Sequence, residues 1–243
     1  MSAILISILL GLTAAAANVF GGAIIVQRNW ERRYLRYFVA LGAGFMLATA
    51  LIEMVPESLE LRGRSAALLI LLGYLIIHFF EHTVTPHFHF GEETHTDEFL
   101  NPSVAYTALA GLLIHTFFDG VSITSGFLIS PWLGTVISGA VILHNVPEGF
   151  TMASIMVAAR RGRSAGVWAA GALGVSRIVG VLAMAVAHRW VHYGLALSAG
   201  VTLYVAASDL IPEVNKSPGP KIALTVALGV ALVLVLRYLF FAY

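Results

Sequence analysis

The feature that most constrains this chain is a series of eight hydrophobic runs separated by short polar breaks. Each run holds about 20 residues, enough to cross the hydrocarbon core of a bilayer as an α-helix. Of the 243 residues, 58% are hydrophobic and 11% are charged, against about 25% charged residues in soluble domains. The sequence therefore predicts an all-α polytopic membrane protein, with a single domain over residues 1–243. The predicted spans are Ala3–Gln27, Tyr37–Pro56, Ser65–His82, Ser103–Ile129, Leu133–Ala159, Ser164–His188, Tyr193–Pro212 and Ile222–Phe241.

Basic residues are divided unequally between the two sets of loops. Cytoplasmic loops carry the excess of Lys and Arg, so the richer side is predicted to be cytoplasmic and both termini to lie outside. The net charge of +1 argues against nucleic acid as a partner, and the absence of cysteine excludes disulfides and thiolate ligands. The richer side holds Arg28, Arg32, Arg33, Arg36, Arg160, Arg161, Arg163, Lys216 and Lys221, and the other holds Arg62, Arg64, Arg189 and Arg237.

Two segments of the chain match each other without gaps. GAGFMLATALIEMVPE (residues 42–57) aligns with SAGVTLYVAASDLIPE (residues 198–213), which places Glu53 over Asp209. These segments belong to spans two and seven, which cross the membrane in opposite directions. The alignment predicts an inverted repeat of spans 1–3 and 6–8 around spans 4–5, an arrangement typical of transporters. Chance recurrence of small residues in membrane helices is the alternative.

Two matched motifs carry ionisable residues into the predicted spans four and five. HTFFDG begins at His115 and HNVPEG begins at His144, and each motif has its acid four residues later, at Asp119 and Glu148. Residues four apart share one helix face, and helices joined by a short connection pack antiparallel. The two faces together supply two imidazoles and two carboxylates, a tetrahedral set suited to Zn²⁺ and acceptable to Fe²⁺, Mn²⁺ or Co²⁺. We expect the metal as a transported substrate and no organic cofactor.

Charge arithmetic favours the same interpretation. A carboxylate at mid-bilayer costs about 2.5 kcal/mol or more, whereas two carboxylates and one divalent cation sum to zero. The alternative is that Asp119 and Glu148 pair with Arg177, which lies near the middle of span six, or stay protonated. Asn145 and Ser122 are candidates to support or replace a ligand, although both also suit interhelical hydrogen bonds.

These motifs resemble the ZIP family of divalent metal transporters over nearly the whole chain. HNVPEG is the most specific piece, and HTFFDG, the Pro-Glu ends of spans two and seven and a His-bearing loop also match. The resemblance implies homodimers in the plasma (inner) membrane that move divalent metals toward the cytoplasm. It places the transport site at His115, Asp119, His144 and Glu148. It also implies an elevator-type motion of a bundle with spans four and five against a scaffold with spans two and seven.

The chain departs from members of this family that hold two adjacent metals. Those members use an Asn after the span-four His and a Glu in span six, where this chain has Thr116 and Arg177. Threonine is a weak ligand and arginine is none. Our hypothesis is that the Arg177 guanidinium replaces the second metal beside Glu148 or Asp119, which leaves a site for one ion. The alternative is that Arg177 reaches the lipid headgroups.

Further acids and histidines lie near the predicted span ends. Glu53 and Glu57 are predicted to flank the entrance, and Asp209 and Glu213 the exit, because acids at a pore mouth concentrate cations. Met46 offers a thioether on the path of the ion, or simply packs. The segment of about residues 83–101 is a His- and acid-rich cytoplasmic loop suited to weak metal binding. Its candidate ligands, with the residue just before it, are His82, His87, His89 and His95.

Two classes of function fit an intramembrane zinc site. An intramembrane zinc metallohydrolase keeps three ligands and an open water position on its metal. Four convergent ligands and an inverted repeat favour a transporter, and no enzymatic activity is expected. The ligand set leaves Zn²⁺, Fe²⁺, Mn²⁺ and Cd²⁺ open as substrates.

Overall fold

The computed structural model describes residues 2–27, 32–83, 102–216 and 219–241, and within these ranges the chain is helical with no strand. Eight helical segments are long and apolar enough to cross a membrane, which confirms the predicted fold class. The predicted span limits agree with the observed ones to within a few residues, except where spans two and seven extend beyond both predicted ends. Single-helix spans are α1 (Ala3–Gln27), α4 (Arg64–Thr83), α5 (Pro102–Ile129), α6 (Pro131–Ala158), α7 (Gly162–Val186) and α10 (Pro220–Phe241).

Spans two and seven each contain a π-helix. Span two runs through α2 (Arg32–Ala48), the π-helix η1 (Thr49–Met54) and α3 (Val55–Arg62). Span seven runs through η3 (His188–Trp190), α8 (Val191–Tyr204), the π-helix η4 (Val205–Leu210) and α9 (Ile211–Asn215). Each π-helix ends two residues before a proline, Pro56 or Pro212. Proline has no N–H to donate, so regular α-helical bonding cannot continue through it, and π-helices are often found at functional sites.

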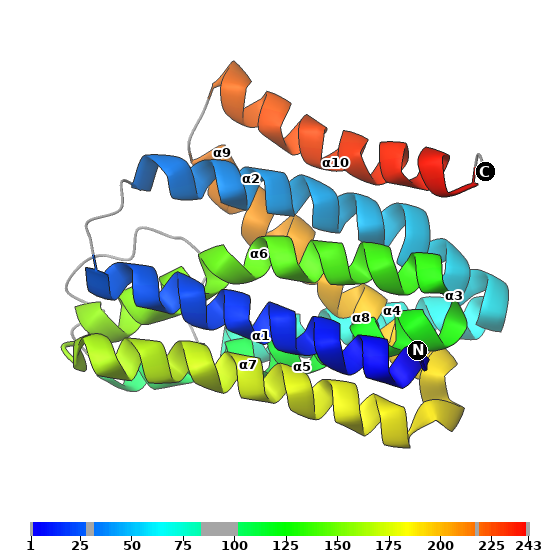
Figure 1. The fold of residues 1–243 in the computed structure, drawn as a ribbon, viewed down its shortest axis with the longest axis horizontal. Coiled ribbons are helices and arrows are strands. Elements are labelled where there is room, and N and C mark those ends of the chain that lie inside the picture. The colour runs from blue at the N-terminus through cyan, green and yellow to red at the C-terminus, as the bar shows by residue number, and fades with distance from the viewer. Residues whose placement is uncertain (1, 28–31, 84–101, 217–218, 242–243) are drawn as a thin grey trace.

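The helices pack in two groups. One group holds α1, α5, α6 and α7, which contact one another, and the other holds the pairs α2–α10 and α4–α8. Figure 1 shows α10 lying along α2 at one edge of the bundle, with α1 and α7 at the other side. In the same view α1 begins and α10 ends at one end of the bundle. The site helices α5 and α6 lie in the first group, in contact with α8 and α2 of the second.

In the second group, close backbone contacts at glycines join α2 to α10 and α4 to α8. A Cβ at Gly44 of α2 would lie 2.1 Å from the Val226 carbonyl oxygen of α10, so this approach requires glycine. A Cβ at Gly200 of α8 would lie 1.9 Å from the Ile70 carbonyl oxygen of α4. The predicted repeat aligns Gly44 with Gly200 and the two π-helices with each other, all at a separation of 156 residues. These correspondences support the inverted repeat, which stays a prediction.

Many large apolar side chains are exposed on the outside of the bundle, while several ionisable side chains are buried beside the apolar core. Leu68, Trp168 and Val186 are more than two-thirds exposed, as suits surfaces in contact with lipid. By contrast, five ionisable residues at the centre of the first group are less than 5% exposed. This inversion of the pattern of soluble proteins is expected of a chain that is solvated by lipid. The five are His115, Asp119, His144, Glu148 and Arg177.

Candidate metal centre

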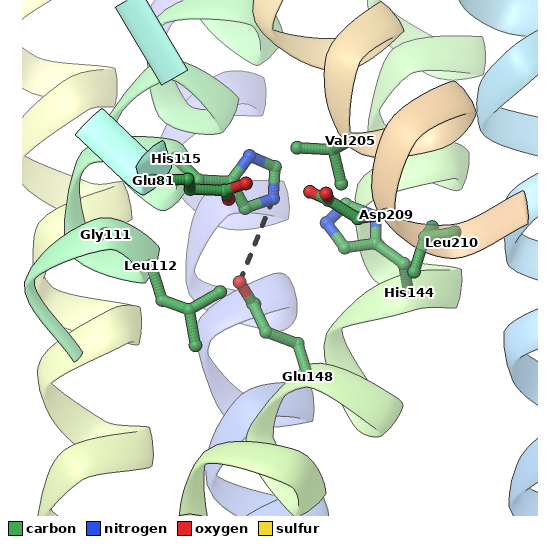
Figure 2. Close-up of a pocket in the computed structure, with 9 residues that line it drawn as sticks. All are labelled: Glu81, Gly111, Leu112, His115, His144, Glu148, Val205, Asp209 and Leu210. Carbon is green, nitrogen blue, oxygen red and sulfur yellow. Dashed lines mark ion pairs between the residues drawn. The ribbon is translucent and has the colours of Figure 1, made fainter. Parts of the chain in front are cut away.

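The four residues of the two matched motifs come together between α5 and α6. Nε2 of His144 lies 3.3 Å from Oδ2 of Asp119, and Nε2 of His115 lies 3.5 Å from the same oxygen. Nε2 of His115 also lies 3.8 Å from Oε1 of Glu148, the contact that is dashed in Figure 2. A spacing of four residues places the His and the acid of each motif on one helix face. The packing of α5 on α6 then brings the two motifs together.

Several ligand atoms in this cluster lack hydrogen-bond partners although they are buried. Both ring nitrogens of His115 and Oε1 of Glu148 have none. Buried polar atoms are rarely left unsatisfied, so these atoms suit a ligand that the protein itself does not supply. Donor atoms of His115, Asp119 and His144 all lie within 4.8 Å of one another, close enough to share a metal ion. Nδ1 of His144 donates to the Ala140 carbonyl (2.8 Å), which turns Nε2 toward the cluster.

Arg177 of α7 lies against the same cluster and is fully buried. Its Nη2 is 3.2 Å from Oδ2 of Asp119 and 3.4 Å from Oε2 of Glu148. Nη2 also donates to Oδ1 of Asn145 at 2.9 Å, and Nη1 donates to Oδ1 of Asn18. The alternative of a headgroup-facing Arg177 is therefore wrong. The charge argument above counted two carboxylates and one dication, which sum to zero, and left out this guanidinium. With Arg177 included, the cluster with one dication bound has a net charge of +1.

Asn18 of α1 is a site residue that the sequence did not reveal. It is fully buried, and its Nδ2 donates to Oε2 of Glu148 at 2.7 Å and to the Asn145 carbonyl at 3.2 Å. A single polar residue in an apolar span is usually an interhelical hydrogen-bonder, so nothing in the sequence linked it to residues more than 120 positions away.

The other residues proposed near the ligands have more ordinary contacts. Asn145 joins the cluster through Arg177 and donates to the Ala14 carbonyl at 2.9 Å. The hydroxyls of Ser122 and Thr116 donate to backbone carbonyls of their own helix, at 2.7 and 3.2 Å. Met46 is 1% exposed and packs within an apolar cluster. The structure therefore brings Asn145 to the site and gives the two hydroxyls a partner within α5.

One pocket is lined by three of the candidate ligands and by one of the two acids predicted at the exit. His115, His144 and Glu148 line it together with Asp209 of η4 and Glu81 of α4. Figure 2 shows the carboxylates of Asp209 and Glu81 on the same side of the pocket as the His115 ring. The wider lining is apolar and comprises Gly111, Leu112, Val205 and Leu210. The second predicted exit acid, Glu213, is half-buried outside the pocket lining and lies 3.3 Å from Nζ of Lys216.

The acids predicted at the entrance, Glu53 and Glu57, do not line this pocket. Both oxygens of Glu53 have partners, because Nε1 of Trp132 donates to Oε2 and Nη1 of Arg237 to Oε1, each at 2.8 Å. Trp132 is the second residue of α6, and its ring packs against Phe240 in a tilted arrangement with 5.0 Å between centroids. Glu57 is half-buried. Both oxygens of Glu53 are therefore bonded within the protein, whereas Asp209 lines a pocket.

The histidine-rich segment lies mostly outside the described residues, which omit 84–101 and with them His87, His89 and His95. His82 lies on the surface in the last turn of α4, and its Nδ1 donates a hydrogen bond to the His78 carbonyl at 2.8 Å.

Comparison with models of known protein families identifies a match. The family model described as "ZIP Zinc transporter" matches residues 1–103 and 101–237, which is almost the whole chain. No curated protein matches.

Proposed function

Because the chain belongs to the ZIP zinc transporter family, a family of divalent metal transporters, we propose that it carries one transition metal ion at a time, with Zn²⁺ the first candidate, toward the cytoplasm. Fe²⁺, Mn²⁺ and Cd²⁺ are further candidates, since two imidazoles and two carboxylates accept several first-row and related ions. The ion is the substrate of the protein and not a resident cofactor.

The observation that carries this proposal is the buried cluster of His115, Asp119, His144 and Glu148, with unsatisfied atoms directed at one another. Buried ionisable groups in a membrane span are costly unless they are paired, and Arg177 supplies one positive charge to two carboxylates. Each helix supplies one imidazole and one carboxylate, so the ion is held between α5 and α6 and not by either helix alone. We assign His115, Asp119 and His144 as ligands through the atoms that converge, and Glu148 through its free Oε1.

Arg177 supports a site for a single ion. Its guanidinium contacts both carboxylates on the side away from the free Oε1 of Glu148. A second dication beside the same carboxylates would meet this fixed positive charge within a few ångströms, which is strongly unfavourable in a medium of low dielectric constant. Anomalous scattering that places two metals bridged by a carboxylate in one protomer would contradict the single-ion site.

The asymmetry of the two ends supports transport by alternating access. The pocket reaches Asp209 near the end of span seven, while Glu53 near the end of span two is bonded to Trp132 and Arg237. The excess of basic residues favours a cytoplasmic position for the Asp209 end, and on that orientation we propose that the pocket opens inward. The two packing groups suit an elevator-type motion, with α1, α5, α6 and α7 moving against a scaffold formed by the other helices. Homodimers in the plasma membrane, with both termini outside, complete the proposal.

The decisive experiment is metal flux into liposomes that contain only this protein. Zn²⁺-dependent quenching of an internal dye should be saturable and should be lost in His144→Ala. Competition by Fe²⁺, Mn²⁺ and Cd²⁺ then ranks the substrates. Hydrolysis of lipid or peptide without flux would replace the transporter with a metallohydrolase.

A further inference from the structure

The glycine that ends each ligand motif is packed against the backbone of a neighbouring helix. A Cβ at Gly149 of α6 would lie 2.0 Å from the Asn18 carbonyl oxygen of α1. A Cβ at Gly120 of α5 would lie 2.0 Å from the Arg177 carbonyl oxygen of α7. Only glycine permits backbones to approach this closely. The two motifs therefore bring the backbones of Asn18 and Arg177 to equivalent places beside Glu148 and Asp119.

A second pair of glycines completes the same arrangement. Gly21 of α1 would meet the Val146 carbonyl oxygen at 2.1 Å, and Gly180 of α7 would meet the Phe117 carbonyl oxygen at 2.0 Å. Gly21 and Gly180 are 159 residues apart, and so are Asn18 and Arg177. Asn18 and Arg177 are therefore counterparts on two helices that flank the ligand helices in the same way.

The side chains of these counterparts meet at one ligand carboxylate. Nη1 of Arg177 donates to Oδ1 of Asn18, whose Nδ2 donates to Oε2 of Glu148. An amide is one of few neutral groups that accept and donate at once, and here it does both in full burial. As a result Oε2 of Glu148 is held by Asn18 and Arg177, while Oε1 has no partner and lies 3.8 Å from Nε2 of His115.

We propose that Asn18 is a positioning residue, which keeps one oxygen of Glu148 available to the transported ion by holding the other oxygen and by taking one arm of the Arg177 guanidinium. This proposal rests on the proposed function. A free guanidinium favours a bidentate pair with both oxygens of a carboxylate. Asn18 occupies Nη1 and so limits Arg177 to a single contact with Glu148. That contact is made by Nη2, which also contacts Asp119 and Asn145. Without Asn18, Arg177 captures both oxygens of Glu148 and competes with the ion.

The test is a double-mutant cycle between Asn18→Ala and Arg177→Met, read as Zn²⁺ affinity by calorimetry on the purified full chain. Residues that orient a metal ligand change affinity by about 10- to 100-fold when mutated, and we expect a loss of that size for Asn18→Ala. In the Arg177→Met background the same substitution should cost less than about threefold, because the competing guanidinium is gone. A packing role for Asn18 predicts equal losses in both backgrounds and would overturn the proposal.

Two further variants keep the test decisive. Ser7→Ala is the matched control, since Ser7 is also fully buried on α1 but bonds only to the Ala3 carbonyl. Its Zn²⁺ affinity should equal that of the unmodified chain, and an Asn18→Ala variant that behaves like this control contradicts the proposal. Asn18→Asp preserves the shape and still accepts from Arg177, but it cannot donate to Oε2 of Glu148, so it should retain more Zn²⁺ affinity than Asn18→Ala and less than the unmodified chain. Loss of affinity in Asn18→Asp as large as that of a lost ligand overturns the proposal even if Asn18→Ala does not fold.

Failure of the proposed function gives a different result. If the unmodified chain binds no Zn²⁺, Fe²⁺, Mn²⁺ or Cd²⁺ in calorimetry and shows no flux in liposomes, the transporter assignment fails and the cycle has no signal to compare. If the unmodified chain binds and transports, only the Asn18 inference is in question. In liposomes the Asn18→Ala variant should raise KM more than it lowers the maximal rate, since the loss lies in holding the ion.

Discussion

Glu53 and Asp209 each occupy the fifth position of a six-residue π-helix, yet their carboxylates have opposite surroundings. Glu53 is bonded to Trp132 and Arg237, whereas Asp209 lines the pocket that reaches the ligand histidines. Trp132 and the proposed ligands His144 and Glu148 lie on the same helix, α6. The bond between Trp132 and Glu53 therefore ties the ligand helix to the end of span two, and movement of α6 away from that end must break it.

Trp132→Phe should open the Glu53 end. The change keeps an aromatic ring but removes the Nε1 donor. A hydrogen bond to a charged group contributes about 1.5–3 kcal/mol, so its loss shifts the balance between closed and open states by about tenfold or more. The chain has no cysteine, so Ala140→Cys, one turn before His144, makes a single reporter. An impermeant thiol reagent applied from the outside should label it faster in Trp132→Phe. Trp190→Phe, at an exposed tryptophan, is the control, and equal labelling rates in both would refute this role.

His144→Ala should abolish substrate binding. It removes a ligand whose Nε2 lies 3.3 Å from the Asp119 carboxylate, and we expect a loss of at least about 100-fold in Zn²⁺ affinity, beyond the effect of residues that merely orient a ligand. Calorimetry on purified protein and uptake in liposomes measure the two consequences separately. His188→Ala, on the exposed histidine of η3, should leave both unchanged. Normal uptake in His144→Ala would show that His144 of α6 is not a metal ligand.

Arg177→Met should make the fold depend on metal. Removal of one partner from a buried charge cluster costs about 3–5 kcal/mol, here because Asp119 and Glu148 lose their only fixed cation among the described residues. In a chelator the melting temperature should therefore fall below that of the unmodified chain. Zn²⁺ should then raise it further than it raises the unmodified chain, since a ligand stabilises the state that binds it. A metal-independent loss of stability would show that Arg177 does not compensate the ligand charges.

Gly149→Ala should separate α1 from α6. The added Cβ would lie 2.0 Å from the Asn18 carbonyl oxygen, and overpacking of this kind costs about 1–3 kcal/mol. The expected results are a lower melting temperature and weaker Zn²⁺ binding, since Asn18 moves away from Glu148. Gly171→Ala on α7 is the control, because a Cβ there meets nothing within 4 Å. That control should be neutral or stabilising by up to about 1 kcal/mol, the helix preference of alanine over glycine.

The sequence was sufficient for the features that depend on length and local spacing. Hydrophobic runs determine where a helix crosses lipid, so the eight spans could be placed closely. The i, i+4 pairing of His115 with Asp119 and of His144 with Glu148 follows from helix geometry alone. The π-helices could not be placed, although Pro56 and Pro212 were visible, because a proline disturbs a helix without specifying the bonding that replaces it.

Residues whose role depends on distant partners were harder to predict. Arg177 was expected beside Glu148 or Asp119, because a charged side chain inside a membrane span usually pairs with an opposite charge. In the structure it contacts both. Asn18 carries no such constraint, since an amide is satisfied by many partners. Glu53 was expected to face the entrance, but Trp132 and Arg237, 79 and 184 residues away along the chain, bind both of its oxygens. Such long-range contacts leave no local pattern in a single sequence.

The packing of α10 on α2 has a consequence for biosynthesis. α10 is made after every other described helix, yet it fills the surface around Gly44 and supplies Arg237 to Glu53. In a growing chain that has inserted α2, the surface around Gly44 therefore stays uncovered and Glu53 lacks Arg237 until α10 leaves the ribosome. Glu53 gains its Arg237 partner only when α10 inserts, so a chain that stalls before Pro220 would present quality-control proteases with an acid that lacks this cation in the membrane.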